Sequence, residues 1–239
     1  MDQHVARRLS DLTTSFYAHA TASFSATRQA PWLGWERLLE LCAFDPTHEL
    51  RVLDLACGNL RFERFLCERF ASVRAWAVDN CDELVSTAPC STKYQHVDLA
   101  QSPHDVEAPL CDLSVSFGFM HHLPLLEQRQ HVLNVLVEHT RPGGWICVSF
   151  WQFAKNPRLR AKARPVEEGE PGDYLLGWQD DAQAQRYCHS FEEEEIDELV
   201  ASVVPHAAEV ARYSADGKTG DLNRYVLLRR EVDAEPTKT

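Results

Sequence analysis

The chain has 239 residues, 44% of them hydrophobic, and a formal net charge of −12 at pH 7. This predicts one domain with a full core, and the lack of an apolar run of about 20 residues excludes a membrane-spanning helix. The acidity excludes a general nucleic-acid binder, because contacts to phosphate groups need lysine and arginine. The N-terminus does not resemble a signal peptide, and the eight cysteines form no C-x-x-C pair. We therefore expect a cytoplasmic protein with reduced thiols and neither a disulfide framework nor a zinc site.

The hydrophobic pattern predicts helices and strands in alternation. The expected strands are residues 51–55, 73–78, 94–97, 113–117, 145–150, 207–213 and 223–229. The expected helices are residues 3–20, 35–44, 60–70, a short one around Leu84 that ends near Pro89, 124–140, and one to about 203 opened by a capping box at Ser190–Glu193. Such a pattern predicts an α/β fold: a Rossmann-like, doubly wound, seven-stranded and mostly parallel sheet with helices on both faces.

The predicted domain spans residues 1–239 and has four parts. These are a helical cap (1–45), a cofactor-binding core (46–152), an insertion or lid (153–190), and a closing helix and strands (191–230). Residues 153–187 are charged and rich in proline and glycine, so we expect them to be irregular; so long a loop in a compact domain is usually functional.

The most informative stretch is residues 51–59, in which a short apolar run ends in Asp54 and a turn of small residues. This pattern predicts a parallel strand that leads into a cofactor-binding loop. A dinucleotide site needs G-x-G-x-x-G, but only Gly58 is a glycine here, and no Gly-Lys-Ser/Thr follows for a P-loop. An ordinary turn of another α/β protein remains an alternative.

Acids also end the next two predicted strands, at Asp79 and Asp98. Ligands of doubly wound sheets bind at the carboxyl ends of the strands, and an acid one βαβ unit after the loop suits the two hydroxyls of a ribose. The sequence therefore predicts that these acids converge on a nucleoside-containing cofactor.

The loop Asp54-x-Ala56-x-Gly58 looks like the first motif of class I S-adenosylmethionine methyltransferases. Phe117–Pro124 and Arg141–Gly144 resemble the fourth and fifth motifs of that class. Four further segments resemble the eukaryotic tRNA wobble-uridine carboxymethyl methyltransferases, in which they correspond to F-s-x-T-R-x-x-P-W, G-D-hydrophobic-W, R-Y-Y-H-x-F and D-x-N-x-Y. In this chain they are residues 24–32, 172–178, 186–191 and 223–225, so that the similarity covers roughly residues 12–230.

The resemblance implies a fold, a cofactor and a reaction. Members of this family use S-adenosylmethionine to methylate the carboxylate of 5-carboxymethyluridine at the tRNA wobble position, and the eukaryotic ones work with a small zinc-binding activator protein. The chain departs from the family pattern at Leu60, which replaces a loop glycine, and at Cys188, which replaces an aromatic residue. Its acidity leaves residues 155–164, with five cations and no acid, as the expected contact to RNA.

The resemblance also implies roles for single residues. Asp79 is expected on the ribose hydroxyls, Asp98 on the adenine amino group, and Gly58 beside the methionine moiety. The full set of expected cofactor-binding residues is Asp54, Ala56, Gly58, Asn59, Asp79, Asn80, Asp98, Leu99, Phe117 and His122.

Four residues are expected in catalysis: Arg28, His121, Arg186 and Tyr187. Arginine suits an acceptor carboxylate, because its planar fork grips two oxygens at once. His121 is expected to face the transferred methyl group or to act as a base, and Tyr187, with the tryptophans Trp32, Trp151 and Trp178, to stack on a base. Core packing and a surface position are the alternatives for the aromatic residues and the arginines. No metal site is expected.

Two other functions remain open. The acceptor is a modified tRNA or, failing that, a small carboxylate or hydroxyl compound. A catalytically silent cofactor-binding protein is the alternative that Leu60 suggests.

Overall fold

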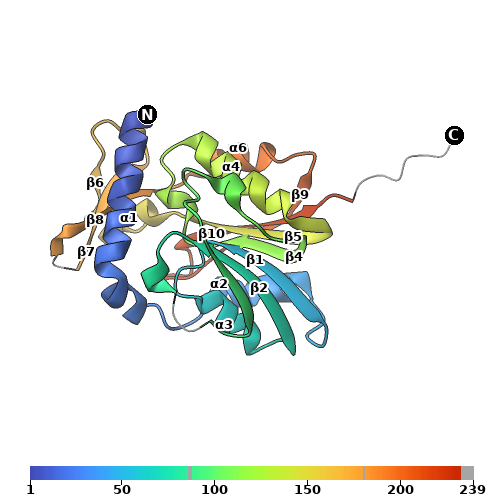
Figure 1. Cartoon of the computed structure of the whole chain (residues 1–239). Coiled ribbons are helices and arrows are strands. Elements are labelled where there is room, and N and C mark those ends of the chain that lie inside the picture. The colour runs from blue at the N-terminus through green and yellow to red at the C-terminus, as the bar shows by residue number, and fades with distance from the viewer. Residues whose placement is uncertain (86–87, 180, 233–239) are drawn as a thin grey trace.

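A computed structural model of the chain describes residues 1–85, 88–179 and 181–232. Its centre is a seven-stranded sheet in the order β3-β2-β1-β4-β5-β10-β9 (Figure 1). The strands are β1 (Glu49–Leu55), β2 (Ser72–Asp79), β3 (Ser91–His96), β4 (Cys111–Ser116), β5 (Thr140–Trp151), β9 (Ala207–Ala215) and β10 (Asn223–Arg230). β1 to β5 are mutually parallel, and β10 lies antiparallel between β5 and β9. The predicted Rossmann-like, mostly parallel fold is confirmed.

Helices cover both faces of this sheet (Figure 1). One face carries α2 (Leu33–Cys42) and α3 (Arg61–Cys67), and the other carries α4 (Leu126–Glu138) and α6 (Glu193–Ala201). Because both faces are covered, the middle strands are continuous apolar runs rather than alternating ones. Residues 52–55 of β1, for example, are all buried.

A second, three-stranded antiparallel sheet lies beside this core, where the sequence predicted an irregular segment. Its order is β6 (Arg164–Pro165), β7 (Asp173–Trp178), β8 (Asp181–His189), and the four-residue helix α5 (Pro157–Arg160) precedes it. The long helix α1 (Gln3–Ala26) runs along it, with Phe16 and Ala20 packed against Ala184 (Figure 1). The prediction of an irregular segment was wrong because this sheet is stabilised by packing against α1, which local composition does not reveal.

Smaller differences concern helix ends. The predicted helix 3–20 continues to Ala26, and α6 begins two residues later than expected, because the backbone N–H of Glu192 donates to Glu195 and so forms the cap there. The helix expected around Leu84 is a 3₁₀ turn (Asp82–Leu84), and residues 86–87 of it lie outside the described residues. The other 3₁₀ turns are Pro103–Asp105, Met120–His122 and Phe153–Lys155.

The cysteines differ in part from the expectation. Cys67 at the end of α3 and Cys90 before β3 form a disulfide, so the prediction of only reduced thiols was wrong for this pair, which the fold brings together across 23 residues. The six other cysteines are free and buried. Among the described residues, no helix has the length and apolar character needed to cross a membrane.

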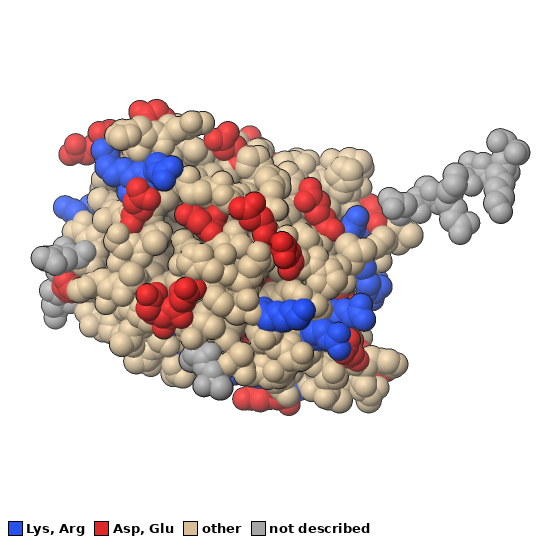
Figure 2. All heavy atoms as spheres, viewed as in Figure 1, with Lys and Arg blue, Asp and Glu red and all other residues tan. Residues whose placement is uncertain are grey.

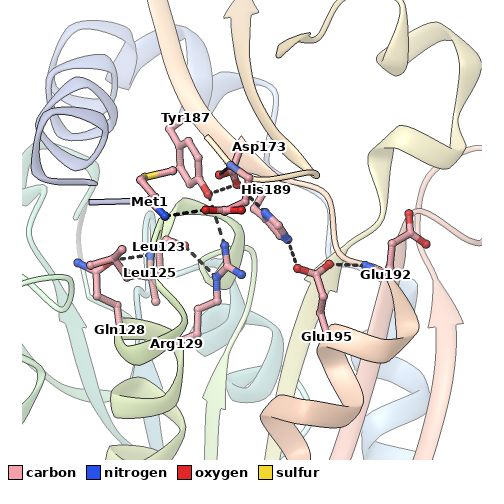
Figure 3. Close-up of polar contacts among 11 residues, drawn as sticks. Met1, Leu123, Leu125, Gln128, Arg129, Asp173, Tyr187, His189, Glu192 and Glu195 are labelled. Carbon is pink, nitrogen blue, oxygen red and sulfur yellow. Dashed lines mark hydrogen bonds and ion pairs between the residues drawn. The ribbon is translucent and has the colours of Figure 1, made fainter. Parts of the chain in front are cut away.

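A buried polar network joins the second sheet to α4 and α6 (Figure 3). Asp173 Oδ1 accepts hydrogen bonds from the Tyr187 hydroxyl at 2.6 Å and from His189 Nδ1 at 2.7 Å, while His189 Nε2 lies 2.8 Å from Glu195 Oε1. Arg129 on α4 donates to the Leu123 carbonyl at 2.9 Å and, more weakly, to Tyr187 at 3.4 Å. Breaking such a network would leave buried charges unpaired, so it fixes the second sheet on the core.

Candidate active site

One cavity of about 700 Å³ opens at the carboxyl ends of β1, β2 and β4, next to α1. All ten expected cofactor-binding residues line it, and so do Arg28, His121 and Arg186. The topology explains this convergence, because parallel strands end at the same edge of the sheet.

The loop after β1 is a tight turn that leaves room for a ligand. The backbone N–H groups of Ala56 and Cys57 donate to the Val78 carbonyl at 2.8 and 3.0 Å, which fixes the loop on β2. Gly58 has a φ of +54°, and a Cβ added there would have no atom within 4 Å. Glycine therefore serves both the left-handed backbone and the open space beside it.

Asp79 at the end of β2 is held by this loop. Its Oδ2 accepts a hydrogen bond from Gly58 N at 2.8 Å and its Oδ1 one from Cys81 N at 3.0 Å. Burial raises the pKa of this carboxyl above its usual value, and these backbone donors oppose the rise. A carboxylate has about four acceptor sites, and three backbone donors (Gly58, Asn80 and Cys81) act on Asp79, so it can still accept a hydrogen bond from a ribose.

The next strand end provides the other wall. Asp98 Oδ1 accepts from Ala100 N at 3.0 Å, which orients the carboxylate, and the neighbouring Leu99 is buried but lines the cavity. Asn59 lines it too, although its side chain also donates to Ser25 and to the Arg28 carbonyl, both at 3.1 Å. Asn59 thus links the loop to the segment that carries Arg28.

Leu60 does not obstruct the site. It has a φ of +58°, its fully buried side chain packs with Cys57 and Ala77, and it is not among the residues that line the cavity. The residues present therefore fit an adenosyl cofactor: fixed acids at two strand ends, an apolar side chain beside one of them, and a loop with open space at Gly58.

Two arginines form the part of the cavity between α1, β8 and the loop. The guanidinium of Arg28 lies 3.5 Å from the ring centre of Phe24, and that of Arg186 lies 4.7 Å from the ring centre of Phe16. Burial lowers the pKa of Arg28 to about 10, so it stays charged at neutral pH. Nη1 of Arg186 is buried and has no hydrogen-bond partner among the described residues. A buried cationic donor without a partner predicts an anionic ligand.

Two adjacent histidines lie between these compartments, in the turn after β4. His122 Nδ1 lies 2.8 Å from the Tyr187 carbonyl, and Nε2 lies 2.8 Å from the Tyr17 hydroxyl. Burial, with the charge of Arg186, lowers the pKa of His122 to about 3, so the ring is neutral, donates from Nδ1 and accepts from Tyr17. Burial, and then the neighbouring His122, lower the pKa of His121 well below its usual value, and its Nδ1 has no partner among the described groups.

His121, His122 and Cys188 place three potential ligand atoms within 4.8 Å of one another. The groups are poorly suited to a metal ion, because both His122 nitrogens are already hydrogen-bonded and burial raises the pKa of the Cys188 thiol to about 11. A thiol binds metal as the thiolate, and Arg186 adds positive charge nearby. The absence of a metal site stays a prediction.

The structure contradicts the predicted position of Tyr187 in the site. Its side chain is fully buried, does not line the cavity, and donates to Asp173 in the network of Figure 3. Successive residues of a strand point to opposite faces, so β8 directs Arg186 to the cavity and Tyr187 away from it. Trp32 and Trp151 line the cavity as expected, whereas Trp178 lies outside its lining and stacks at 5.1 Å on Arg28.

Other residues that line the cavity were not predicted from the sequence. Tyr17 is the main one, because it orients His122; an aromatic residue seven positions before Phe24 on one helix was the available signal. Arg61, the first residue of α3, lines the cavity with its guanidinium 4.9 Å from the ring centre of Trp32. A cation directly after the loop was the corresponding signal.

Comparisons with known proteins agree with this geometry. Residues 53–148 match a family model described as a methyltransferase domain. A tRNA (carboxymethyluridine(34)-5-O)-methyltransferase, ALKBH8 of Macaca fascicularis, is 25% identical over 157 residues; these are 63% of this chain but 21% of that protein, so the chain spans about a fifth of this relative's length. A protein of Encephalitozoon cuniculi that carries the name of a methyltransferase is 28% identical over 187 residues, 77% of this chain and 82% of that one.

Solved structures share the fold. A S-adenosylmethionine-dependent methyltransferase of Clostridium acetobutylicum matches with a TM-score of 0.63 at 14% identity, covering 91% of this chain and 98% of that one. The protein is a methyltransferase that uses S-adenosylmethionine. The enzyme is also similar to the 1,6-didemethyltoxoflavin-N1-methyltransferase of Burkholderia thailandensis, solved with 1,6-didemethyltoxoflavin and S-adenosylhomocysteine, with a TM-score of 0.64 at 17% identity, covering 95% of this chain and 91% of that one.

Proposed function

We propose that the enzyme transfers the methyl group to an ionised carboxylate oxygen, and that this carboxylate is the 5-carboxymethyl group of a wobble uridine in tRNA. The observation that carries the proposal is the pair Arg28 and Arg186 in the same cavity as the cofactor residues. Nη1 of Arg186 is buried there and has no partner in the described part of the chain. The guanidinium groups lie over the rings of Phe24 and Phe16. Arg28 Nη1 donates to Thr27 at 3.0 Å, so the other N–H groups of Arg28, together with Nη1 of Arg186, are the donors proposed for the two oxygens of one acceptor.

The chemistry needs orientation and no base. A carboxylate with an ordinary pKa of about 4 is ionised at neutral pH, so no proton has to be removed. One carboxylate oxygen attacks the methyl carbon, the carbon–sulfur bond breaks, and an ester and S-adenosylhomocysteine form. Holding oxygen and methyl in line supplies on the order of 7–11 kcal/mol of the barrier reduction. The neutral His121 and His122 fit this reaction, because no carboxylate among the described residues is paired with either ring to make it a base.

Support for tRNA comes from the outer segments and from the surface. The family motifs that contain Arg28 and Arg186 both contribute to the acceptor side of the cavity, and ALKBH8 is named for this reaction. All five cations of residues 155–164 are exposed, although Lys155 lies 3.9 Å from Glu193. A small activator protein is a further part of this proposal, by analogy with the eukaryotic members of the family.

A small carboxylate is the second candidate acceptor. The net charge of −12 favours it, and on the face shown in Figure 2 acidic side chains lie across the middle while basic ones gather toward the edges. A free metabolite would need only Arg28 and Arg186, whereas tRNA would also need residues 155–164.

The test compares acceptors that differ in one group. Labelled S-adenosylmethionine is supplied with an anticodon stem-loop that contains 5-carboxymethyluridine, with the same RNA as its amide, and with the free nucleoside. We expect methyl transfer to the acid and none to the amide. Arg186→Gln should lower kcat/KM by about 10- to 150-fold, the equivalent of a lost charge-assisted hydrogen bond of about 1.5–3 kcal/mol.

Arg186→Lys is the matched variant, because it keeps the charge and loses the fork; it should recover only part of the rate. Wild-type kcat/KM for the acid in Arg186→Gln would contradict the carboxylate assignment. Equal rates on the stem-loop and on the free nucleoside would favour the small-molecule acceptor.

A further inference from the structure

Two carboxyl groups lie buried against each other below the cofactor loop. Asp54, at the end of β1, is 3% exposed, and Glu63, in the first turn of α3, is fully buried. Among the described residues, Asp54 Oδ1 and both carboxyl oxygens of Glu63 are buried and accept no hydrogen bond from another residue. The two carboxyls are close enough for each to affect the pKa of the other. Two carboxyls can hydrogen-bond only when a proton lies between them.

The surroundings favour a single shared proton. Burial, and then the charge of Glu63, raise the pKa of Asp54 well above its usual value, and burial also raises that of Glu63. The other charged or titratable groups that face the pair are Asp79 on β2, Cys57 in the loop and Arg64 on α3. Arg64 is the one cation among them, and it also donates to the Asn59 carbonyl at 2.6 Å. Two negative charges on neighbouring buried carboxyls are therefore unfavourable while no cofactor is bound.

The two carboxyls differ in access to the cofactor. Asp54 lines the cavity beside Ala56 and Gly58, whereas Glu63 lies behind it and does not line the cavity. The methionine end of S-adenosylmethionine carries a positively charged ammonium group. Next to Asp54, this group would neutralise the negative charge that the shared proton neutralises in the free enzyme. Glu63 thus reaches the cofactor only through Asp54.

We propose that Glu63 is a positioning residue that shares one proton with Asp54 in the free enzyme, and that the pair releases this proton to solvent when the ammonium group of the cofactor binds beside Asp54. The inference goes beyond the proposed acceptor and holds for any methyl acceptor. Its consequence is that cofactor affinity falls as the pH drops, by up to about tenfold per pH unit while one proton is released.

Calorimetry tests this without turnover. S-Adenosylhomocysteine is titrated into the 239-residue enzyme in buffers with different ionisation enthalpies. The pH is 6.5, because the α-amino group of the ligand is mostly protonated there. We expect release of on the order of one proton per ligand for the wild type and none for Glu63→Gln, whose amide can donate to Asp54 but holds no titrating proton. Glu68→Gln, an exposed acid at the end of the same helix, is the matched control and should behave as the wild type.

A second ligand and a second measurement complete the test. 5′-Methylthioadenosine lacks the amino acid portion and should bind without proton release. In the wild type, infrared spectra in heavy water should show the band of a protonated carboxyl group, and this band should disappear when S-adenosylhomocysteine is added. This measurement needs no variant, so it tests the proposal even if Glu63→Gln folds poorly. Equal proton release by wild type and Glu63→Gln, equal release with 5′-methylthioadenosine, or a carboxyl band that persists in the complex would overturn the proposal.

Discussion

Leu60 offers the sharpest test of how the cofactor loop is built, because glycine and alanine should rank there in an unusual order. Its backbone lies in the left-handed region (φ +58°), which costs an L-residue roughly 1–2 kcal/mol, and its side chain is fully buried. Removing a buried leucine side chain costs about 2–5 kcal/mol. Leu60→Gly loses the side chain but relieves the backbone, so we expect a net loss of roughly 1–3 kcal/mol. Leu60→Ala loses the side chain without that relief.

The assay is urea unfolding of wild type, Leu60→Gly and Leu60→Ala, together with calorimetric titration of S-adenosylhomocysteine. Leu60→Ala should be less stable than Leu60→Gly by about 1 kcal/mol, although alanine is the larger residue. The affinity for the ligand should change by less than about threefold in either variant once both are folded, because the Leu60 side chain lies outside the cavity lining.

Two results would refute this reasoning. A Leu60→Ala protein more stable than Leu60→Gly would show that the backbone at this position is not left-handed. A gain in affinity of about tenfold or more in Leu60→Gly, at unchanged stability, would show that the leucine crowds the cofactor after all.

Four further outcomes are expected. Asp79→Ala should weaken S-adenosylhomocysteine by about 1.5–3 kcal/mol in calorimetry, through the ribose and through loss of the acceptor for Gly58 N, and wild-type affinity would remove Asp79 from the site. The pKa of His122 is lowered to about 3, so below pH 6.5 the unfolded chain takes up a proton that the folded chain does not. The unfolding free energy should therefore decrease as the pH drops, by up to about 1.4 kcal/mol per pH unit. In urea unfolding, His122→Gln should show a weaker dependence of the unfolding free energy on pH than the wild type. Reversing the charge of Arg158 together with Lys162 should abolish methylation of RNA in a labelled-cofactor assay and spare S-adenosylhomocysteine binding, whereas unchanged RNA methylation would exclude this contact. Asp173→Asn, which disrupts the network of Figure 3, should lower the unfolding free energy by about 3–5 kcal/mol and speed amide exchange in β7 and β8, and exchange at the wild-type rate would show that the network does not anchor the second sheet.

The cofactor side of the site was predictable because it depends on strand direction alone. Once Asp54, Asp79 and Asp98 are placed at the ends of parallel strands, the geometry of the sheet brings them to one edge, whatever the rest of the chain does. The proposed acceptor side depends on which way each residue of β8 points. Sequence similarity predicted a role in the site for both Arg186 and Tyr187. Only the packing of β8 against α1 determines that Arg186 faces the cavity and Tyr187 does not.

Glu63 was not predictable for a different reason. In the sequence it follows Phe62 and precedes Phe65 and Leu66 on a short helix, where an acid is normally exposed. Its burial follows from how α3 packs on the sheet, and its interaction with Asp54 follows from the turn between β1 and α3. Similarly, the second sheet was not predicted because β7 and β8 are stabilised by pairing with each other and by packing against α1. Residues of α1 are far from β7 and β8 in the sequence, so local composition does not indicate these contacts.

The enzyme consists of a core that matches the methyltransferase model and of flanking segments, which include α1 and the second sheet. Residues 53–148, which match the methyltransferase model, contain the strand-end acids, while Arg28, Tyr17 and Arg186 lie outside that stretch. Under the proposed acceptor site, exchange of the flanking segments changes the acceptor while the cofactor residues of the core stay the same. On this proposal, we expect a chimera that carries α1, its following segment and β6 to β8 on another such core to take over the acceptor preference. Similarity confined to the core would then not indicate what a relative methylates.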